Sequence, residues 1–221
     1  MSRRLVAVTA GLSQPSSTRL VADRLGSSVV RAAGERGVDI DVQVVELRDL
    51  AHDIANALVT GFPAGDLRAV VDAVAAADAV VAVTPVFTAS YSGLFKSFFD
   101  VLDPDALAGT PVLVAATGGT ARHSLVLDHA MRPMFTYLHA VVVPTGVFAA
   151  AEDWGAGDGA DRALAERIDR AAGELAALLA GPGGAGSGGA GSRERRAPAP
   201  DPYQEPTAFV DLLREHSGQQ V

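Results

Sequence analysis

Cysteine is absent from the sequence. Its absence excludes a disulfide framework, an iron–sulfur cluster held by cysteine ligands, and catalysis by a thiol. No group of side chains has the spacing of a metal-binding cluster, so we expect no metal site. Any oxidation or reduction by this chain would therefore need a bound cofactor.

Basic charge and long apolar runs are also scarce. The chain has 18 Lys and Arg against 26 Asp and Glu, a net charge of -8, and this leaves no basic face for nucleic acid. No apolar run approaches the roughly 20 residues that a membrane span needs. Arg3 and Arg4 precede the apolar run Leu5–Ala10, but that run is too short for a signal peptide. We expect a cytoplasmic protein that binds neither nucleic acid nor membrane.

The residues that are present suffice for one well-filled domain and an extension. The chain has 221 residues, of which 48% are hydrophobic, and we expect residues 1–180 to fold as one domain. Residues 181–200 are rich in Gly, Ala and Pro, which predicts a flexible linker. Residues 201–221 form a C-terminal tail with a short apolar segment at Phe209, Val210, Leu212 and Leu213. We expect this segment to dock on an apolar patch, and a tail without structure is the alternative.

Apolar runs that alternate with helical patterns predict an α/β fold. The expected strands are Leu5–Ala10, Val38–Val44, Ala79–Val83, Pro111–Ala116 and Ala140–Val143, the last continuing to Phe148. Helices are expected from near Thr18, over Asp66–Ala77, behind Gly93, over Arg122–Tyr137 and over Asp161–Leu179. The buried stripe of the first helix is expected to comprise Leu20, Val21, Leu25 and Val29, and Leu50–Pro63 is expected to be irregular. This order of elements predicts a doubly wound, five-stranded parallel sheet.

The loop after the first strand, GLSQPSST at residues 11–18, places hydroxyl groups at the start of a helix. Free backbone N–H groups and the positive end of the helix dipole attract an anion there. Four hydroxyls, those of Ser13, Ser16, Ser17 and Thr18, favour a phosphate, while a simple N-cap with spare serines is the alternative. The loop has neither the G-x-G-x-x-G pattern nor a Walker A pattern, which disfavours a Rossmann dinucleotide site and a P-loop.

Two later segments follow buried strands and are expected at the same edge of the sheet. The first, TPVFTASYSGLFKSFFD at residues 84–100, begins as an accessible loop, and this is where a planar ligand would lie. The second contains Gly118 and Gly119, which would let the backbone approach a flat ligand closely. His123 and His129 follow, but a helical His is more often a surface or packing residue than an acid or base.

Three segments of the chain resemble the NADPH-dependent FMN reductases, in particular those that serve flavin-dependent monooxygenases. They are GLSQPSST, TPVFTASYSGLFKSFFD and GGTARHSLVLDHAMRPMF, and the resemblance extends over about Arg4 to Ala180. The subgroup paired with luciferase-like monooxygenases is the most similar. The resemblance implies a flavodoxin-like fold with strand order 2-1-3-4-5, helices on both faces of the sheet, and a homodimer or homotetramer. We expect the apolar segment of the C-terminal tail to dock at the subunit boundary of that oligomer, close to the ring loop.

The resemblance also implies which residues contact the flavin. Those that would hold the FMN phosphate are Ser13, Gln14, Ser16, Ser17 and Thr18. Those that would border the isoalloxazine ring are Pro85, Val86, Phe87 and Thr88, with Gly118, Gly119 and Thr120 on its pyrimidine side. Hydride transfer from NADPH to flavin requires stacked rings and no side-chain acid or base, so we expect no catalytic residue.

These observations favour an NAD(P)H-dependent FMN reductase, and two alternatives stay open. One is a quinone or azo reductase on the same scaffold, which would differ only in the acceptor that stacks on the reduced flavin. The other is a flavodoxin-like electron carrier or nucleotide-binding module without turnover, since one fold hosts many functions. The small, open ring loop favours the enzyme, because one-electron carriers tend to sandwich their flavin between aromatic side chains.

Overall fold

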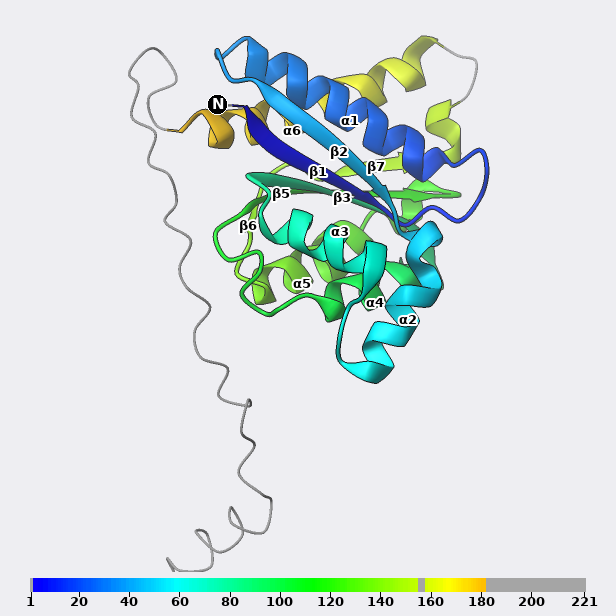
Figure 1. Ribbon diagram of the computed structural model, residues 1–221. Coiled ribbons are helices and arrows are strands. Elements are labelled where there is room, and N and C mark those ends of the chain that lie inside the picture. Colours follow the sequence, from blue (N-terminus) through cyan, green and yellow to red (C-terminus); the bar gives the residue numbers. More distant parts are fainter. Residues whose placement is uncertain (1, 155–157, 182–221) are drawn as a thin grey trace, which may run out of the picture. The chain divides into compact units, whose positions relative to one another are not determined.

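The computed structural model describes residues 2–154 and 158–181, whose helices pack on a central sheet (Figure 1). The principal strands are β1 (Arg3–Thr9), β2 (Ile40–Glu46), β3 (Ala79–Phe87), β5 (Pro111–Gly118) and a fifth strand that is split into β6 (Val141–Val142) and β7 (Val147–Ala150). All pair in parallel, in the order β2-β1-β3-β5-β6, and β7 also pairs with β5. The predicted order 2-1-3-4-5 is confirmed.

Apolar side chains on both faces of the central strands explain why helices cover both sides of the sheet. In β1, Val6 and Val8 pack on one face while Leu5 and Ala7 pack on the other, and β3 and β5 alternate in the same way. The Leu5 face carries α1 (Ser17–Gly34) and α6 (Asp158–Ala180) (Figure 1). The Val6 face carries α2 (Ala51–Thr60), α3 (Gly65–Ala75), α4 (Gly93–Val101) and α5 (Arg132–Tyr137).

Aromatic rings fill the core on the second face. Phe95 and Phe99 of α4 lie against Phe135 of α5, with ring centroids 6.3 and 4.9 Å away. Phe98 is also fully buried, so the helical spacing expected behind Gly93 is confirmed. Such pairs add about 0.5–1.5 kcal/mol each beyond the area they bury. The cluster therefore anchors the start of α4, which follows the candidate ring loop.

Three predictions about the helices and the segments around them were wrong. Leu20 is 43% exposed, because the ridge that faces the sheet runs through Val21, Leu25 and Val29 at i, i+4 spacing, and Leu20 precedes it by one residue. Leu50–Pro63 is mostly helical: a 3₁₀ turn, η1 (Leu47–Leu50), leads into α2, which buries Ile54 and ends at Gly61 with φ 80°.

The third error concerns the single helix expected over Arg122–Tyr137. The segment consists of a 3₁₀ turn, η2 (Ala121–His123), a π-helical turn, η3 (Leu127–Met131), and then α5. Pro133 at the start of α5 has no N–H to donate to the preceding turn, so a regular α-helical ladder is interrupted there. His123 and His129 are both exposed, in keeping with the surface role expected for them.

The two remaining predictions concern membrane-spanning helices and the C-terminal part of the chain. No helix in residues 2–154 and 158–181 is long and apolar enough to cross a membrane. The linker predicted for residues 181–200 and the tail predicted for residues 201–221 lie outside the described residues, apart from Gly181, and so stay predictions.

The corrected stripe of α1 can be tested by a pair of substitutions. Leu25→Ala removes a fully buried side chain and should lower the free energy of unfolding by about 2–5 kcal/mol. Leu20→Ala, the matched control in the preceding turn, should change it by only about 0.5 kcal/mol. Chemical denaturation of both variants provides the measurement, and equal losses would show that Leu20 belongs to the core.

Candidate functional site at the carboxyl edge of the sheet

The loop of residues 11–16 folds tightly back on itself before α1 begins. Ser16 is the N-cap of α1, and its Oγ accepts a hydrogen bond from the backbone N–H of Arg19 at 3.2 Å. A Cβ at Gly11 would lie 2.0 Å from that Oγ, so a side chain at position 11 would displace the capping hydroxyl. Ser13, Gln14 and Ser17 are exposed around the helix N-terminus, where the first N–H groups of a helix have no carbonyl partner within the helix.

Thr18 differs from the other hydroxyl residues of this loop because its side chain faces the core. It is 2% exposed, and its Oγ1 lies 2.9 Å from the Oγ1 of Thr117 at the end of β5. The hydroxyl that we expected to face a phosphate thus links the start of α1 to the neighbouring site segment. A contact between Thr18 and an anion would have to use its backbone N–H.

The segment after Val83 extends the strand, which differs from the loop expected there. β3 runs through Thr84, Pro85, Val86 and Phe87 and then turns back into the short antiparallel strand β4 (Ser90–Tyr91). Pro85 lies beyond Thr9–Val83, the last residue pair between β1 and β3, so its missing N–H removes no bond to β1. Pro85 is buried and Val86 half-buried, whereas Phe87 and Thr88 are exposed at the edge of the sheet.

The turn between β3 and β4 has an unusual backbone. Thr88 and Ala89 have φ values of 49° and 65°, the left-handed region that L residues other than Asn, Asp and Gly rarely adopt. The turn is held by Thr84, whose Oγ1 accepts a hydrogen bond from the N–H of Ser92 at 3.0 Å. Ser92 in turn caps α4 by accepting from the N–H of Phe95. The surrounding core thus fixes a strained turn beside the exposed end of β3.

The third segment, Gly118–Thr120, follows β5. A Cβ at Gly118 would lie 2.9 Å from the ring of Phe148, whereas a Cβ at Gly119 would meet no atom within 4 Å. Because β3 pairs with β5 through Pro85 and Thr117, this segment begins beside the exposed end of β3. The first loop reaches the same place through the Thr18–Thr117 hydrogen bond. The structure therefore brings the three segments together at one edge of the sheet.

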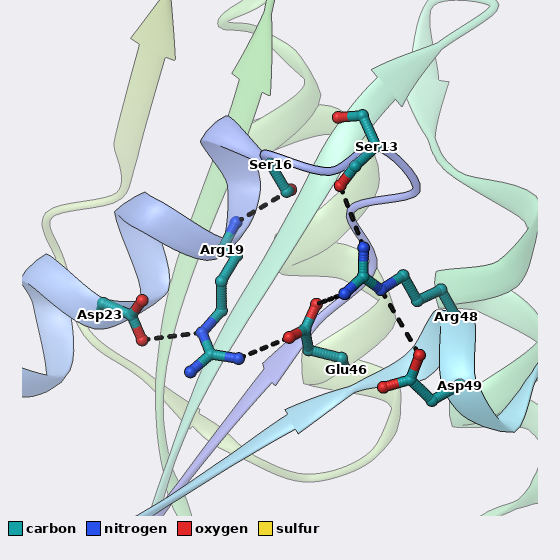
Figure 2. A network of polar contacts seen from close by, with 7 residues as sticks. All are labelled: Ser13, Ser16, Arg19, Asp23, Glu46, Arg48 and Asp49. Atoms are coloured by element: carbon teal, nitrogen blue, oxygen red, sulfur yellow. Dashed lines mark hydrogen bonds and ion pairs between the residues drawn. The ribbon is translucent and has the colours of Figure 1, made fainter.

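Charged residues that the sequence did not single out surround the first loop (Figure 2). Arg19 of α1 forms ion pairs with Asp23 at 2.8 Å and Glu46 at 2.6 Å. Its hydrogen bond to Asp23, followed by the charges of Asp23 and Glu46, raises the pKa of Arg19 above its ordinary value. Glu46 also pairs with Arg48, at 3.0 Å. The sequence offers little indication of this network of ion pairs, because its residues come from three elements that are separate in the chain.

A flavin mononucleotide fits the donors at this edge. A helix N-terminus with neutral donors, such as the loop of residues 11–18, can bind a phosphate, and a flat ring can approach a backbone that no Cβ covers, such as that of Gly119. The buried Oγ1 of Thr9, at the end of β1, has no hydrogen-bond partner in the described part of the chain. No group of acidic or histidine side chains suited to a metal occurs among the described residues.

Comparison with known proteins identifies relatives of this chain. A family model described as NADPH-dependent FMN reductase matches residues 3–155. An FMN reductase (NADPH) of Pseudomonas aeruginosa is 39% identical over 178 residues, which cover 80% of this chain and 93% of that protein. An NADH-dependent FMN reductase SfnF of Pseudomonas fluorescens is 38% identical over 183 residues, covering 82% and 95% of the two chains.

Solved structures extend the comparison to the fold. An oxidoreductase from Corynebacterium diphtheriae has 52% sequence identity and a TM-score of 0.77, covering 80% of this chain and 97% of that one. A flavodoxin, WrbA-like protein from Agrobacterium tumefaciens is 16% identical with a TM-score of 0.52, covering 81% and 98%. The second likeness concerns the fold alone. The predicted flavodoxin-like fold is confirmed.

The strained turn predicts a stabilising substitution. Ala89→Gly should raise the free energy of unfolding by about 1 kcal/mol, because glycine adopts a positive φ without the Cβ clash that an L residue has there. Ala55→Gly, at an exposed position inside α2, should instead lower it by about 1 kcal/mol. Thermal and urea unfolding of the two variants measure both effects, and a loss of stability in Ala89→Gly would contradict the strain.

Proposed function

The chain belongs to the NADPH-dependent FMN reductase family, and from this membership we propose that it transfers a hydride from NAD(P)H to FMN at the carboxyl edge of its sheet. The proposal rests mainly on one observation, the meeting of three segments around Thr117. Its backbone pairs with Pro85 of β3, and its hydroxyl lies 2.9 Å from that of Thr18. A phosphate, a planar ring and the pyrimidine edge of that ring thus have adjacent sites.

We assign the phosphate of FMN to the start of α1. The side chains of Ser13, Gln14, Ser16 and Ser17 surround that end of the helix, and the hydroxyls among them can donate without adding charge. The burial of Thr18 supports a role through its backbone only. Neutral donors at a helix N-terminus are a common way of binding phosphate in proteins.

We assign the isoalloxazine ring to the space between the end of β3 and the segment after β5. Pro85 and Val86 would support the ring, with Phe87 and Thr88 at its border, and Gly118, Gly119 and Thr120 would face its pyrimidine side. When bound, FMN supplies the hydride-accepting chemistry. The chain supplies orientation and leaves one face of the ring open to the nicotinamide, and its backbone N–H groups can stabilise charge on the pyrimidine side.

We further propose that the reduced flavin serves a flavin-dependent monooxygenase of the luciferase-like type. The resemblance of the three segments supports this assignment, as it supports a homodimer or homotetramer in the cytoplasm. The alternative acceptors, quinones and azo dyes, would bind the same open face of the ring. A competition between FMN and such acceptors under NADPH distinguishes these substrates.

The activity itself is tested by steady-state kinetics of the purified protein. NADPH oxidation should require added FMN and should saturate with FMN concentration, because the site is built around the phosphate and ring. Flavin binding without NADPH or NADH oxidation would indicate an electron carrier. Absence of both binding and turnover would contradict the proposed function.

The two glycines after β5 separate flavin binding from stability. Gly119→Val adds a side chain where no atom lies within 4 Å, so the fold should be retained while FMN binding weakens by about tenfold or more, or about 1.4 kcal/mol. Gly118→Val should chiefly lower stability, since its side chain would meet Phe148. Gly34→Val, at another open glycine in the last turn of α1, is the matched control. Normal FMN affinity in a folded Gly119→Val variant would place the ring elsewhere.

A further inference from the structure

Arg48 reaches from the β2 side of the molecule onto the loop that precedes α1. It lies in η1, two residues after the end of β2. Its Nη1 donates to the backbone carbonyl of Ser13 at 3.1 Å. The side-chain oxygen of Gln14, in the orientation that its surroundings require, accepts from Nη2 and Nη1 of Arg48 at 2.5 and 3.0 Å. One guanidinium thus binds two consecutive residues of the loop, and Figure 2 shows it beside Ser13.

Glu46 joins this guanidinium to the first turn of α1. Its two carboxylate oxygens form ion pairs with different arginines, Oε2 with Arg48 at 3.0 Å and Oε1 with Arg19 at 2.6 Å. Arg19 also donates its backbone N–H to the N-cap Ser16. The loop is therefore held at its middle by Arg48 and at its end by the cap, and Glu46 connects the two supports (Figure 2).

The charges of this network show that Arg48 is already neutralised. Arg19 and Arg48 contribute two positive charges, whereas Asp23, Glu46 and Asp49 contribute three negative ones. Neither guanidinium is a free cation that waits for an anion. The effect of Arg48 on a bound phosphate must therefore come mainly from where it places the loop.

The burial of Arg48 distinguishes it from an ordinary surface ion pair. Its side chain is only 17% exposed, and that of Glu46 18%, whereas Arg68 and Asp72 of α3 form an exposed pair at 61% and 60%. Among the described residues the Nε of Arg48 is buried without a hydrogen-bond partner, although a carboxylate oxygen of Asp49 lies 3.5 Å away. Burial of an unsatisfied donor lowers stability. The network thus maintains this loop geometry despite an energetic cost.

We propose that Arg48 is the positioning residue for the phosphate end of the flavin site, and that it sets the preference for FMN over riboflavin, which lacks the phosphate. Through Ser13 and Gln14 it fixes the loop so that the start of α1 faces the phosphate. This inference rests on the proposed function. It assigns Arg48 no part in the transfer of the hydride.

The test compares the binding of two flavins in the absence of NAD(P)H. Titrations followed by flavin fluorescence give the Kd of FMN and of riboflavin for the full chain and for Arg48→Gln. We expect the Kd of FMN to rise about tenfold or more in the variant and that of riboflavin to change less than about twofold, because only FMN uses the loop. Arg48→Lys should recover part of the FMN preference, since an ammonium can replace one hydrogen bond of the fork but not its planar geometry.

Arg68→Gln is the matched control, because it removes an exposed arginine that pairs with Asp72 in the next turn of α3. It should leave both Kd values unchanged. Equal losses for FMN and riboflavin in Arg48→Gln, accompanied by a lower melting temperature, would reduce Arg48 to a general structural role and overturn the inference. An unchanged FMN affinity would overturn it as well.

The same titrations separate this inference from the proposed function. A wild-type chain that binds neither flavin would contradict the FMN reductase site itself. A wild-type chain that reduces FMN but binds it no better than riboflavin would leave the activity intact and overturn the role of Arg48.

Discussion

Burial of the central strands on both faces is the constraint on which the site depends. β1, β3 and β5 present apolar side chains alternately to the two helical layers, so a polar group inside the sheet would lose its hydration without a partner. The strand hydroxyls occur where this double cover ends, at Thr9, Thr84 and Thr117. Because these strands are parallel, their carboxyl ends lie at one edge. Polar contacts with a ligand thus gather there as a consequence of how the core is built.

Hydrogen bonds of buried hydroxyls fix the positions of the segments at this edge. The hydroxyl of Thr84 accepts a hydrogen bond from the N–H of Ser92 and thereby fixes the hairpin of β3 and β4. Thr18 and Thr117 join α1 to β5 across the sheet face. A net hydrogen bond contributes only about 0.5–1.5 kcal/mol to stability. The larger effect of these bonds is on geometry: the Thr84 bond shapes the loop of one βα unit, and the Thr18–Thr117 bond sets the relative position of two units.

The sequence predicted the strands well, because most of them are short apolar runs bounded by turn residues, whereas the strand order came from the family resemblance. The predictions from sequence were wrong for elements whose pattern depends on only one or two residues. α2 was missed because only Ile54 and Ala57 are buried along it, and its exposed positions include His52, Asp53 and Asn56. The extension of β3 was missed because Pro85 is typical of a strand end, and only the loss of the β1 neighbour makes it acceptable inside β3. Family membership was predicted correctly from three segments, which together cover only part of the chain.

The residues around the first loop show a different limit of sequence reasoning. The hydroxyls of residues 13–18 are adjacent in the chain, so their accumulation at a helix start is visible in the sequence. Arg48 lies 35 positions after Ser13, and its contact with the Ser13 carbonyl exists only because β2 pairs with β1. Glu46 occupies the register position opposite Thr9, the last residue of β1. Parallel pairing therefore delivers both the end of β2 and the start of the first loop to the same edge. The sheet that buries the core also determines which arginine supports the loop.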